Sequence, residues 1–238
     1  MFQTYKINSI FPTIQGEGFR TGVPSWFIRV GECNLRNSCW VDGGCDTNFD
    51  YFYITEVDCI INEMSNSKSI VDVVITGGEA TLQFLNPLFK SLKKNGYFIT
   101  IETNGLLYPG SAIEFVDLYS CSPKYSNFKT KFNPRCIKSI TETIKRDKLT
   151  QIKFVVKNKE DIDMAKDIIE LVITDVGFPS DLSYRWGVFF QPHRMENFYD
   201  EATIKNYKNL IKEYLNDKLL NMVSCRWGLQ SHKILGLD

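Results

Sequence analysis

Three cysteines, Cys33, Cys39 and Cys45, lie within thirteen residues of one another, and their thiolates are candidate metal ligands. Five residues separate each cysteine from the next, in a stretch rich in Asn, Gly and Asp, which predicts a loop. Three thiolates can bind three irons of a cubane iron–sulfur cluster and leave the fourth iron without a protein ligand. An open iron can hold the amino and carboxylate groups of S-adenosylmethionine, and one electron from the cluster then yields an adenosyl radical.

A zinc site is the alternative interpretation of the same cysteines. Zinc would take the three thiolates together with Asp46 or a histidine. The two histidines, His193 and His232, are far from the loop in the sequence, and zinc ligands are usually paired at short spacing. The spacing therefore favours an iron–sulfur cluster but leaves zinc open.

Two positions before the cysteine loop also carry polar groups suited to a ligand. Gln15 and Glu17 flank Gly16 and can hydrogen-bond the amide and amino edge of a pterin, although a plain exposed turn has the same composition. Arg29 stands in the otherwise apolar segment 25–30, where a buried guanidinium needs an anion. That anion is either a ligand carboxylate or an internal Asp or Glu, and the sequence leaves both open.

Three polar tripeptides follow apolar runs further along the chain: Gly77-Gly78-Glu79, Glu102-Thr103-Asn104 and Ser122-Pro123-Lys124. The two glycines can expose backbone to a ligand, and the carboxylate of Glu79 can accept from an ammonium group. Each tripeptide also fits an ordinary turn, and a glutamate at a helix start is favoured by the helix dipole alone.

The segments that must position these residues alternate between apolar strands and helices. Strands are predicted over 25–30, 70–75, 97–102, 115–119, 152–156 and 188–190, and helices over 54–64, 82–92, 161–172 and 204–215. This alternation predicts an α/β fold with parallel strands, in which ligands bind at the carboxyl ends of the strands. We expect the three tripeptides to line one mouth of a partial TIM-like barrel with its helices outside.

The composition agrees with one folded domain over residues 1–238, because the hydrophobic fraction is 43%. Lys plus Arg and Asp plus Glu both number 28, which gives no electrostatic basis for a nucleic-acid or membrane partner. We interpret the basic segment 124–148 as a solvated helix and loop. No leader or bilayer-spanning stretch is seen, which predicts a cytoplasmic protein whose seven cysteines stay reduced.

Taken together, these motifs resemble those of the 7-carboxy-7-deazaguanine synthases, a family of radical S-adenosylmethionine enzymes. Segment 29–36 resembles the start of the family's cysteine loop and 45–47 its Cys-Asp-Thr end. The family loop is usually Cys-x3-Cys-x2-Cys; the spacing is longer here, and Cys39 is assigned because no other cysteine lies between Cys33 and Cys45. Further matches are 11–18, 76–83 with Ala80 in place of the family's proline, 101–105, 120–124 and 227–236.

The resemblance implies a set of site residues. The cluster ligands are Cys33, Cys39 and Cys45, and Thr47 helps hold a magnesium ion. The contacts to S-adenosylmethionine are Gly77, Gly78, Glu79, Asn104, Ser122 and Lys124. The contacts to substrate are Gln15, Glu17, Arg29, Glu102, Gln230 and His232.

The resemblance also implies a reaction and partners. The enzyme is a lyase that converts 6-carboxy-5,6,7,8-tetrahydropterin to 7-carboxy-7-deazaguanine with loss of ammonia, as in queuosine biosynthesis. Its cofactors are a [4Fe-4S] cluster, S-adenosylmethionine and Mg2+, its electron donor is a protein such as flavodoxin, and it forms a homodimer. Two alternatives remain: a radical enzyme that activates a protein glycine, and a non-enzymatic zinc-binding adaptor.

Overall fold

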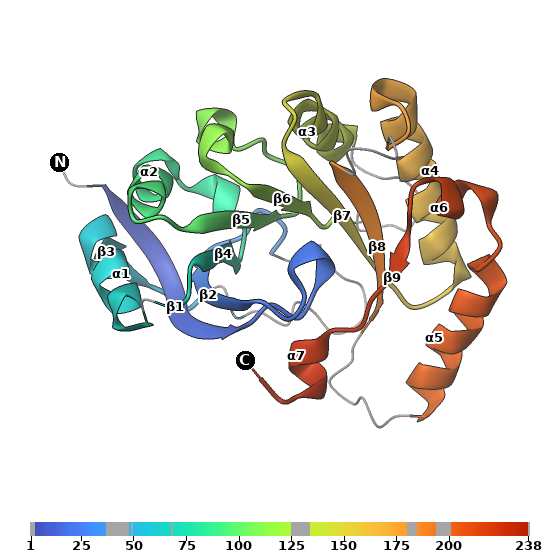
Figure 1. The fold of residues 1–238 in the computed structure, drawn as a ribbon, viewed down its shortest axis with the longest axis horizontal. Helices are drawn as coiled ribbons and strands as arrows, with labels where there is room; N and C mark the ends of the chain where they lie inside the picture. Colours follow the sequence, from blue (N-terminus) through green and yellow to red (C-terminus); the bar gives the residue numbers. More distant parts are fainter. Residues whose placement is uncertain are drawn as a thin grey trace.

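The computed structural model of the chain describes residues 3–36, 48, 50–67, 69–124, 134–179, 185–193 and 201–237. Within these residues, nine strands form one sheet in the order β3-β1-β2-β4-β5-β6-β7-β8-β9 (Figure 1). The strands are β1 Thr4–Ile14, β2 Pro24–Val30, β3 Tyr53–Glu56, β4 Asp72–Gly77, β5 Phe98–Thr103, β6 Leu118–Cys121, β7 Leu149–Val156, β8 Trp186–Pro192 and β9 Arg226–Trp227. The α-helices are α1 Val57–Met64, α2 Asn86–Lys94, α3 Pro134–Lys145, α4 Lys159–Val176, α5 Glu201–Tyr214, α6 Lys218–Met222 and α7 Ser231–Ile234.

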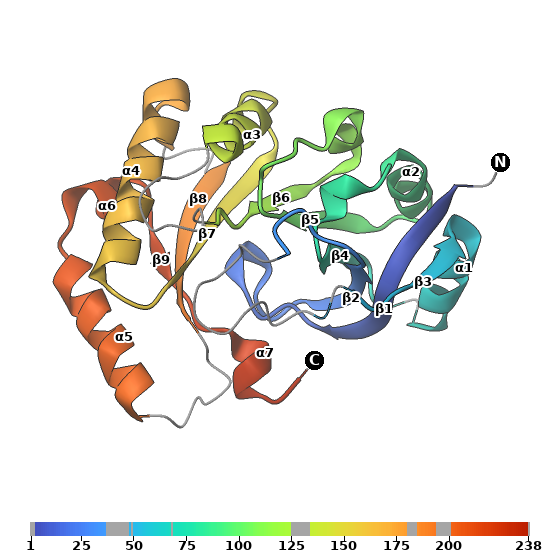
Figure 2. The same cartoon turned by 180° about the vertical axis from the view of Figure 1, so that it is seen from behind.

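The sheet is parallel from β2 through β9 and is not closed. Only β1 runs antiparallel, pairing with β2 on one side and with β3 on the other. Helices α1 to α6 lie along the outer side of the curved sheet, whereas α7 lies on its inner side (Figures 1 and 2). The predicted fold class, a partial barrel of parallel strands with helices outside, is confirmed.

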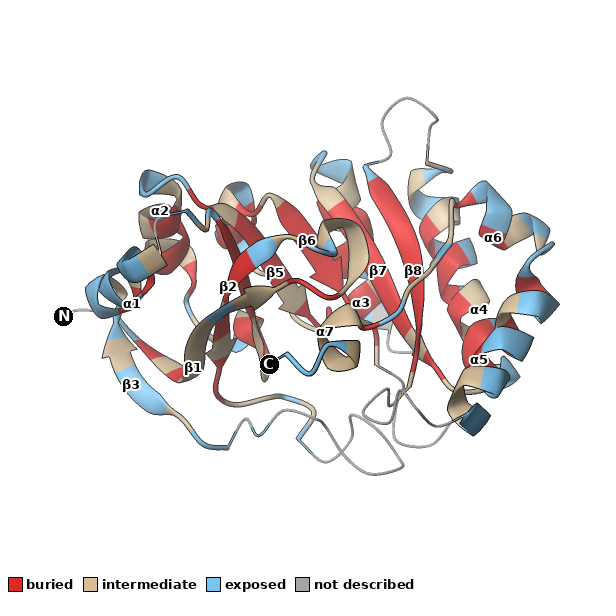
Figure 3. Ribbon diagram, turned by 60° about the horizontal axis from the view of Figure 1, so that its bottom comes forward, coloured by how far each residue is buried: buried red, intermediate tan, exposed pale blue. Residues whose placement is uncertain are grey.

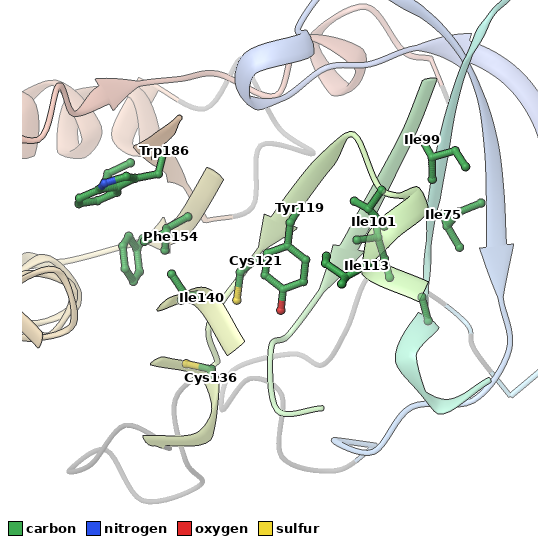
Figure 4. Packing of buried hydrophobic residues seen from close by; sticks show 14 of the residues in the cluster. Ile75, Ile99, Ile101, Ile113, Tyr119, Cys121, Cys136, Ile140, Phe154 and Trp186 are labelled. Carbon is green, nitrogen blue, oxygen red and sulfur yellow. The ribbon is translucent and has the colours of Figure 1, made fainter. Parts of the chain in front are cut away.

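Alternation along the strands sends apolar side chains to the outer face of the sheet. Ile75, Ile101 and Tyr119 occupy paired positions on β4, β5 and β6 and are fully buried. Figure 4 shows them packed with Ile113 and Ile140 from the helical layer. In Figure 3 the buried colour is concentrated in the central strands and on the helix sides that face them. This layer is the hydrophobic core.

The neighbouring positions on the same strands carry polar side chains toward the inner face. Arg29 pairs with Thr76, Glu102 with Ser120, and Ser120 with Gln151. Ile75 of β4 pairs with Ile101 of β5, and Thr76 and Glu102 are the next residues on these two strands, so their side chains are neighbours as well. A polar row therefore crosses the inner face from β2 to β7, and it lies close to the carboxyl ends of β2, β4 and β5.

Some predicted elements differ from the structure. Ile54 and Thr55 belong to β3, not to a helix, because they pair with β1, and α1 begins only at Val57. The predicted helix over 82–92 is a short 3-10 turn, Ala80–Leu82, followed by α2 with Pro87 in its first turn. Strand β1 was not predicted, whereas helix α3 lies within the segment 124–148 that was interpreted as a solvated helix and loop. Among the described residues, no helix has the length and apolar character needed to cross a bilayer.

Candidate active site at the carboxyl ends of the strands

The start of the cysteine loop contacts two of the three polar tripeptides. Cys33 lies three residues after the end of β2 at Val30 and is half-buried. The turn after β4 contacts the start of this loop, because the amide of Glu79 donates to the carbonyl of Glu32 at 2.8 Å. The side-chain amide of Asn104 donates to Oδ1 of Asn34 at 2.7 Å. The structure thus brings Cys33 beside residues predicted to bind S-adenosylmethionine. Cys39, Cys45 and Thr47 lie outside the described residues.

Gly77 is required where the first tripeptide meets β2. Its φ of +104° lies in the region that side chains rarely adopt. A Cβ atom there would lie 2.6 Å from both the backbone nitrogen and oxygen of Val30. The adjacent amide of Gly78 donates to that same Val30 oxygen at 2.9 Å. The two glycines therefore allow the turn to approach the end of β2, just before Cys33.

Glu79 is fully buried, and its carboxylate accepts hydrogen bonds from four protein donors. The amide and hydroxyl of Thr81 donate to Oε1 at 3.1 and 2.6 Å, and the hydroxyl of Thr103 donates to it at 2.6 Å. The amide of Asn104 donates to Oε2 at 2.8 Å. In the structure Glu79 therefore orients the turn that carries Asn104, and its contact with an ammonium group stays a prediction. Gly77 and Gly78 are only half-buried.

The third tripeptide joins the same edge of the sheet. The amide of Ser122 donates to the carbonyl of Thr103 at 2.8 Å, which couples the end of β6 to the end of β5. Lys124 Nζ donates to the Ser122 hydroxyl at 2.9 Å. All three tripeptides thus meet at one mouth, as the sequence predicted.

A second group, which we term the acid–lysine network, lies beside this mouth on the inner face. It consists of Gln15, Glu17, Thr76, Glu102, Lys153 and Gln230. The ammonium of Lys153 contacts Glu17 Oε2 at 2.7 Å and Glu102 Oε1 at 2.8 Å. Gln230 Nε2 donates to Glu17 Oε1 at 2.6 Å. Thr76 Oγ1 donates to Glu102 Oε2 at 3.0 Å, and Gln15 Nε2 donates to Glu102 Oε1 at 3.4 Å.

Both charges at the centre of the network are stabilised by their partners. Burial alone raises the pKa of Glu17, but the Lys153 charge and hydrogen bonds from Gln230 and Lys153 outweigh it and lower the pKa from 4.5 to about 2. Burial likewise lowers the pKa of Lys153, and the charges of Glu102 and Glu17 more than reverse this, so its pKa rises. Glu17 is therefore a carboxylate and Lys153 an ammonium at neutral pH.

The C-terminal segment covers the Gln15–Glu17 turn. The amide of Ser231 donates to the carbonyl of Gly16 at 3.2 Å, and a Cβ at Gly16 would lie 1.9 Å from His232 Nδ1. Among the described residues, this buried nitrogen has no hydrogen-bond partner. Burial is the largest influence on His232 and lowers its pKa, so the ring is neutral at pH 7 and its unprotonated nitrogen can accept a hydrogen bond. Gln15, Glu17, Gln230 and His232 are thus together, as predicted.

Arg29 has no carboxylate within ion-pairing distance in the part of the chain that the structure describes. Its guanidinium lies 4.7 Å from the ring centroid of Phe11 and is half-buried. The alternative of an internal ion pair is therefore not supported by these residues. Without an ion pair among the described residues, the guanidinium can donate to an anion on the inner face.

Sequence reasoning missed three residues of the site: Ser120, Gln151 and Lys153. Gln151 accepts from the amide of Phe19 at 2.8 Å and donates to the Ser120 hydroxyl at 2.8 Å, which ties the segment after Glu17 to the sheet. Lys153 could have been found by the signal that singled out Arg29, because each is the only charged residue of its strand.

No family model matches the chain. Over 246 aligned residues it is 35% identical to the 7-carboxy-7-deazaguanine synthase of Rickettsia prowazekii, and the alignment covers 98% of this chain and 88% of that protein. The chain belongs to the 7-carboxy-7-deazaguanine synthase family. The enzyme of the same name from Aquifex aeolicus is 30% identical over 221 residues, covering 91% of this chain and 90% of that protein.

Solved structures agree with this membership at the level of fold. QueE from Escherichia coli superimposes with a TM-score of 0.63 over 95% of this chain and 93% of that one, at 22% identity. SuiB from Streptococcus suis gives a TM-score of 0.55 over 87% of this chain and 48% of that one, at 15% identity. Such low identities show a shared fold only.

As a 7-carboxy-7-deazaguanine synthase the protein is a radical S-adenosylmethionine lyase, which implies a four-iron cluster and S-adenosylmethionine. The described residues fit both groups. Cys33 stands at the mouth, and its sulfur accepts from the amide of Leu35 at 3.4 Å, an interaction that favours a thiolate ligand. Gly77 lets the next turn approach the end of β2, three residues before that cysteine, because a Cβ there would lie 2.6 Å from the Val30 backbone. The zinc-adaptor and glycine-activating alternatives are not favoured.

Proposed function

We propose that this protein converts 6-carboxy-5,6,7,8-tetrahydropterin to 7-carboxy-7-deazaguanine with loss of ammonia, at the mouth formed by the strand ends. The observation that carries the proposal is the acid–lysine network. It places two carboxylates and two amide side chains, which can bind the polar edge of a pterin, on the inner face beside the glycine turn and Cys33.

The network and Arg29 suit opposite ends of this substrate. The amino and amide groups of the pterin are hydrogen-bond donors, and the carboxylates of Glu17 and Glu102 are acceptors. The 6-carboxylate is an anion, and the guanidinium of Arg29 is a planar donor with no described internal partner. Gln230 and His232 cover the turn that carries Glu17, and we propose that they close the site over the ring.

The protein's own task in the reaction is to place the substrate and exclude water. When bound, the cluster and S-adenosylmethionine would supply the radical chemistry that starts the reaction on the pterin. We propose that Gly77, Gly78, Asn104, Ser122 and Lys124 orient the cofactor at the mouth. Glu79 supports them by fixing the Asn104 turn through its buried hydrogen bonds.

Three further assignments complete the proposal. Cys39 and Cys45 would supply the other two cluster ligands, and Thr47 would help hold a magnesium ion, a cation that prefers hard oxygen ligands. A protein such as flavodoxin delivers the electron. The active form is a homodimer.

The test is an anaerobic assay of the reduced protein with S-adenosylmethionine and the carboxytetrahydropterin. We expect about four irons and four sulfides per chain and a ring-contracted product, lighter by one ammonia, in the mass spectrum. A colourless protein with one bound zinc, or cofactor cleavage without that product, contradicts the proposal.

A matched pair of cysteine variants locates the cluster. Cys33→Ser should lose iron and cofactor cleavage, because it removes a ligand. Cys59→Ser should keep both, because Cys59 is exposed on α1 and lies outside the loop. Equal iron content in the two variants would place the cluster elsewhere.

A further inference from the structure

Lys153 is a buried charge of the site, with only 4% of its side chain exposed. It is the only charged residue of β7, and it lies on the inner face, two positions after Gln151. An ammonium in such a position is costly unless it is fully paired. The two carboxylates that pair with it come from segments 136 and 51 residues away in the sequence.

We propose that Lys153 is a positioning residue for substrate: its charge holds Glu17 and Glu102 side by side as carboxylates, so that the pair accepts hydrogen bonds from a ligand edge rich in N–H donors. The inference rests on the proposed function, because it assigns that edge to the amino and amide groups of the pterin. Without the ammonium, two neighbouring buried carboxylates would repel each other, and one would take up a proton.

The remaining acceptor capacity of the two carboxylates supports this role. A carboxylate offers about four lone-pair sites. The described residues donate two hydrogen bonds to Glu17, from Lys153 and Gln230, and three to Glu102, from Lys153, Gln15 and Thr76. Acceptor sites are thus left on both groups. Two carboxylates and one ammonium also leave a net negative charge, which favours donors over anions at this end.

A purely structural role, in which Lys153 only ties the Glu17 turn to the sheet, does not explain why a charged residue is needed at this position. The segment after Glu17 is already tied to β7 by Gln151, which accepts from the amide of Phe19 at 2.8 Å. The C-terminal segment is tied to the same turn by the bond from Ser231 to Gly16. Since these contacts hold the segments without Lys153, what the lysine adds is charge.

The test compares Lys153→Met, Lys153→Gln and Lys153→Arg with wild type, as cluster-loaded full-length protein. Lys153→Met should raise the KM for the carboxytetrahydropterin by about tenfold or more, with a smaller change in kcat. Lys153→Gln keeps hydrogen-bond donors but not the charge, so it should behave like Lys153→Met and serves if that variant does not fold. Lys153→Arg keeps the charge and should retain most of the binding.

The pH profile separates charge from structure. In the Met and Gln variants burial raises the pKa of the Glu17 carboxyl, and only the Gln230 hydrogen bond and the His232 charge remain to oppose it. We therefore expect kcat/KM to fall as the pH drops from about 8 to 5.5, while the wild type changes less. Glu102 and His232 also face Glu17, from β5 and α7, but both are present in every variant. A difference between the profiles therefore reports the loss of Lys153.

Infrared titration gives a readout that needs no turnover. Lys153→Met should show a protonated carboxyl band in that pH range that disappears in the Lys153→Met, Glu17→Gln double variant. Lys166→Met is the matched control, because Lys166 pairs with Asp217 away from the site, and it should leave KM and the profile unchanged. An unchanged KM, profile and infrared spectrum in Lys153→Met overturns the inference. A wild type that makes no product while the carboxyl band appears overturns the proposed function instead.

Discussion

Gly77→Ala should destabilise the protein far more than the same change at a glycine with open space around it. At Gly77 two effects of the new methyl group lower the free energy of unfolding. A positive φ costs roughly 1–2 kcal/mol for a residue with a side chain. Contact at 2.6 Å with the backbone of Val30 forces strands apart and adds roughly 1–3 kcal/mol of overpacking strain. The expected loss in the free energy of unfolding is therefore about 2–5 kcal/mol.

Gly96→Ala is the control, because Gly96 has a φ of +82° but nothing within 4 Å of its Cβ position. It should lose only the backbone cost, about 1–2 kcal/mol. Urea unfolding of both variants under anaerobic conditions measures the difference, which should be about 1–3 kcal/mol, provided that their m-values agree. Equal destabilisation of the two variants would show that the approach of Gly77 to β2 is not tight.

Three further predictions concern the site. The pKa of Glu17 is lowered from 4.5 to about 2, so the ionised carboxylate contributes about 3 kcal/mol to the free energy of unfolding above about pH 4.5, and this contribution is lost as the pH falls toward 2. The urea midpoint of the wild type should therefore fall with pH in this range, and that of Glu17→Gln should fall less. Gln151→Ala leaves the Phe19 amide and the Ser120 hydroxyl without their partner and should cost about 1–3 kcal/mol in thermal unfolding, whereas no loss would mean that water replaces it. Arg29→Met should raise the KM for the carboxylated substrate about tenfold or more. It should change the free energy of unfolding by less than about 0.5 kcal/mol, because Arg29 has no described internal ion pair. An unchanged KM would contradict the role assigned to Arg29.

The arrangement of the three tripeptides could be predicted because it depends on a general property of parallel sheets. Each tripeptide follows an apolar strand, and the carboxyl ends of parallel strands meet at one edge. The bonds from Asn104 to Glu79 and from Ser122 to Thr103 confirm that they meet. The roles assigned to their side chains remain predictions, because they depend on ligands.

The first strand could not be predicted from local pattern. In β1 the polar residues Asn8 and Ser9 and the exposed Pro12 interrupt the alternation, and its register with β2 shifts between Ile7 and Ser9. Its place is decided by pairing on both sides, with β2 and β3, and such pairing does not show in a window of neighbouring residues.

The partners of buried charges were also beyond local reasoning. Lys153 stands out in its strand, but Glu17 lies 136 residues away and nothing in the spacing joins them. Glu79 could be read as a ligand to an ammonium, whereas the fold surrounds its carboxylate with donors from Thr81, Thr103 and Asn104. Such contacts follow from the packing of distant segments.

The most direct measurement is an anaerobic crystal structure of the protein with its cluster, S-adenosylmethionine and the carboxytetrahydropterin. The pterin's amino edge should lie within hydrogen-bond distance of Glu17 and Glu102, its carboxylate at Arg29, and an iron at Cys33. A pterin bound away from these carboxylates, or a Cys33 sulfur without iron, would contradict the assignment of this mouth as the active site.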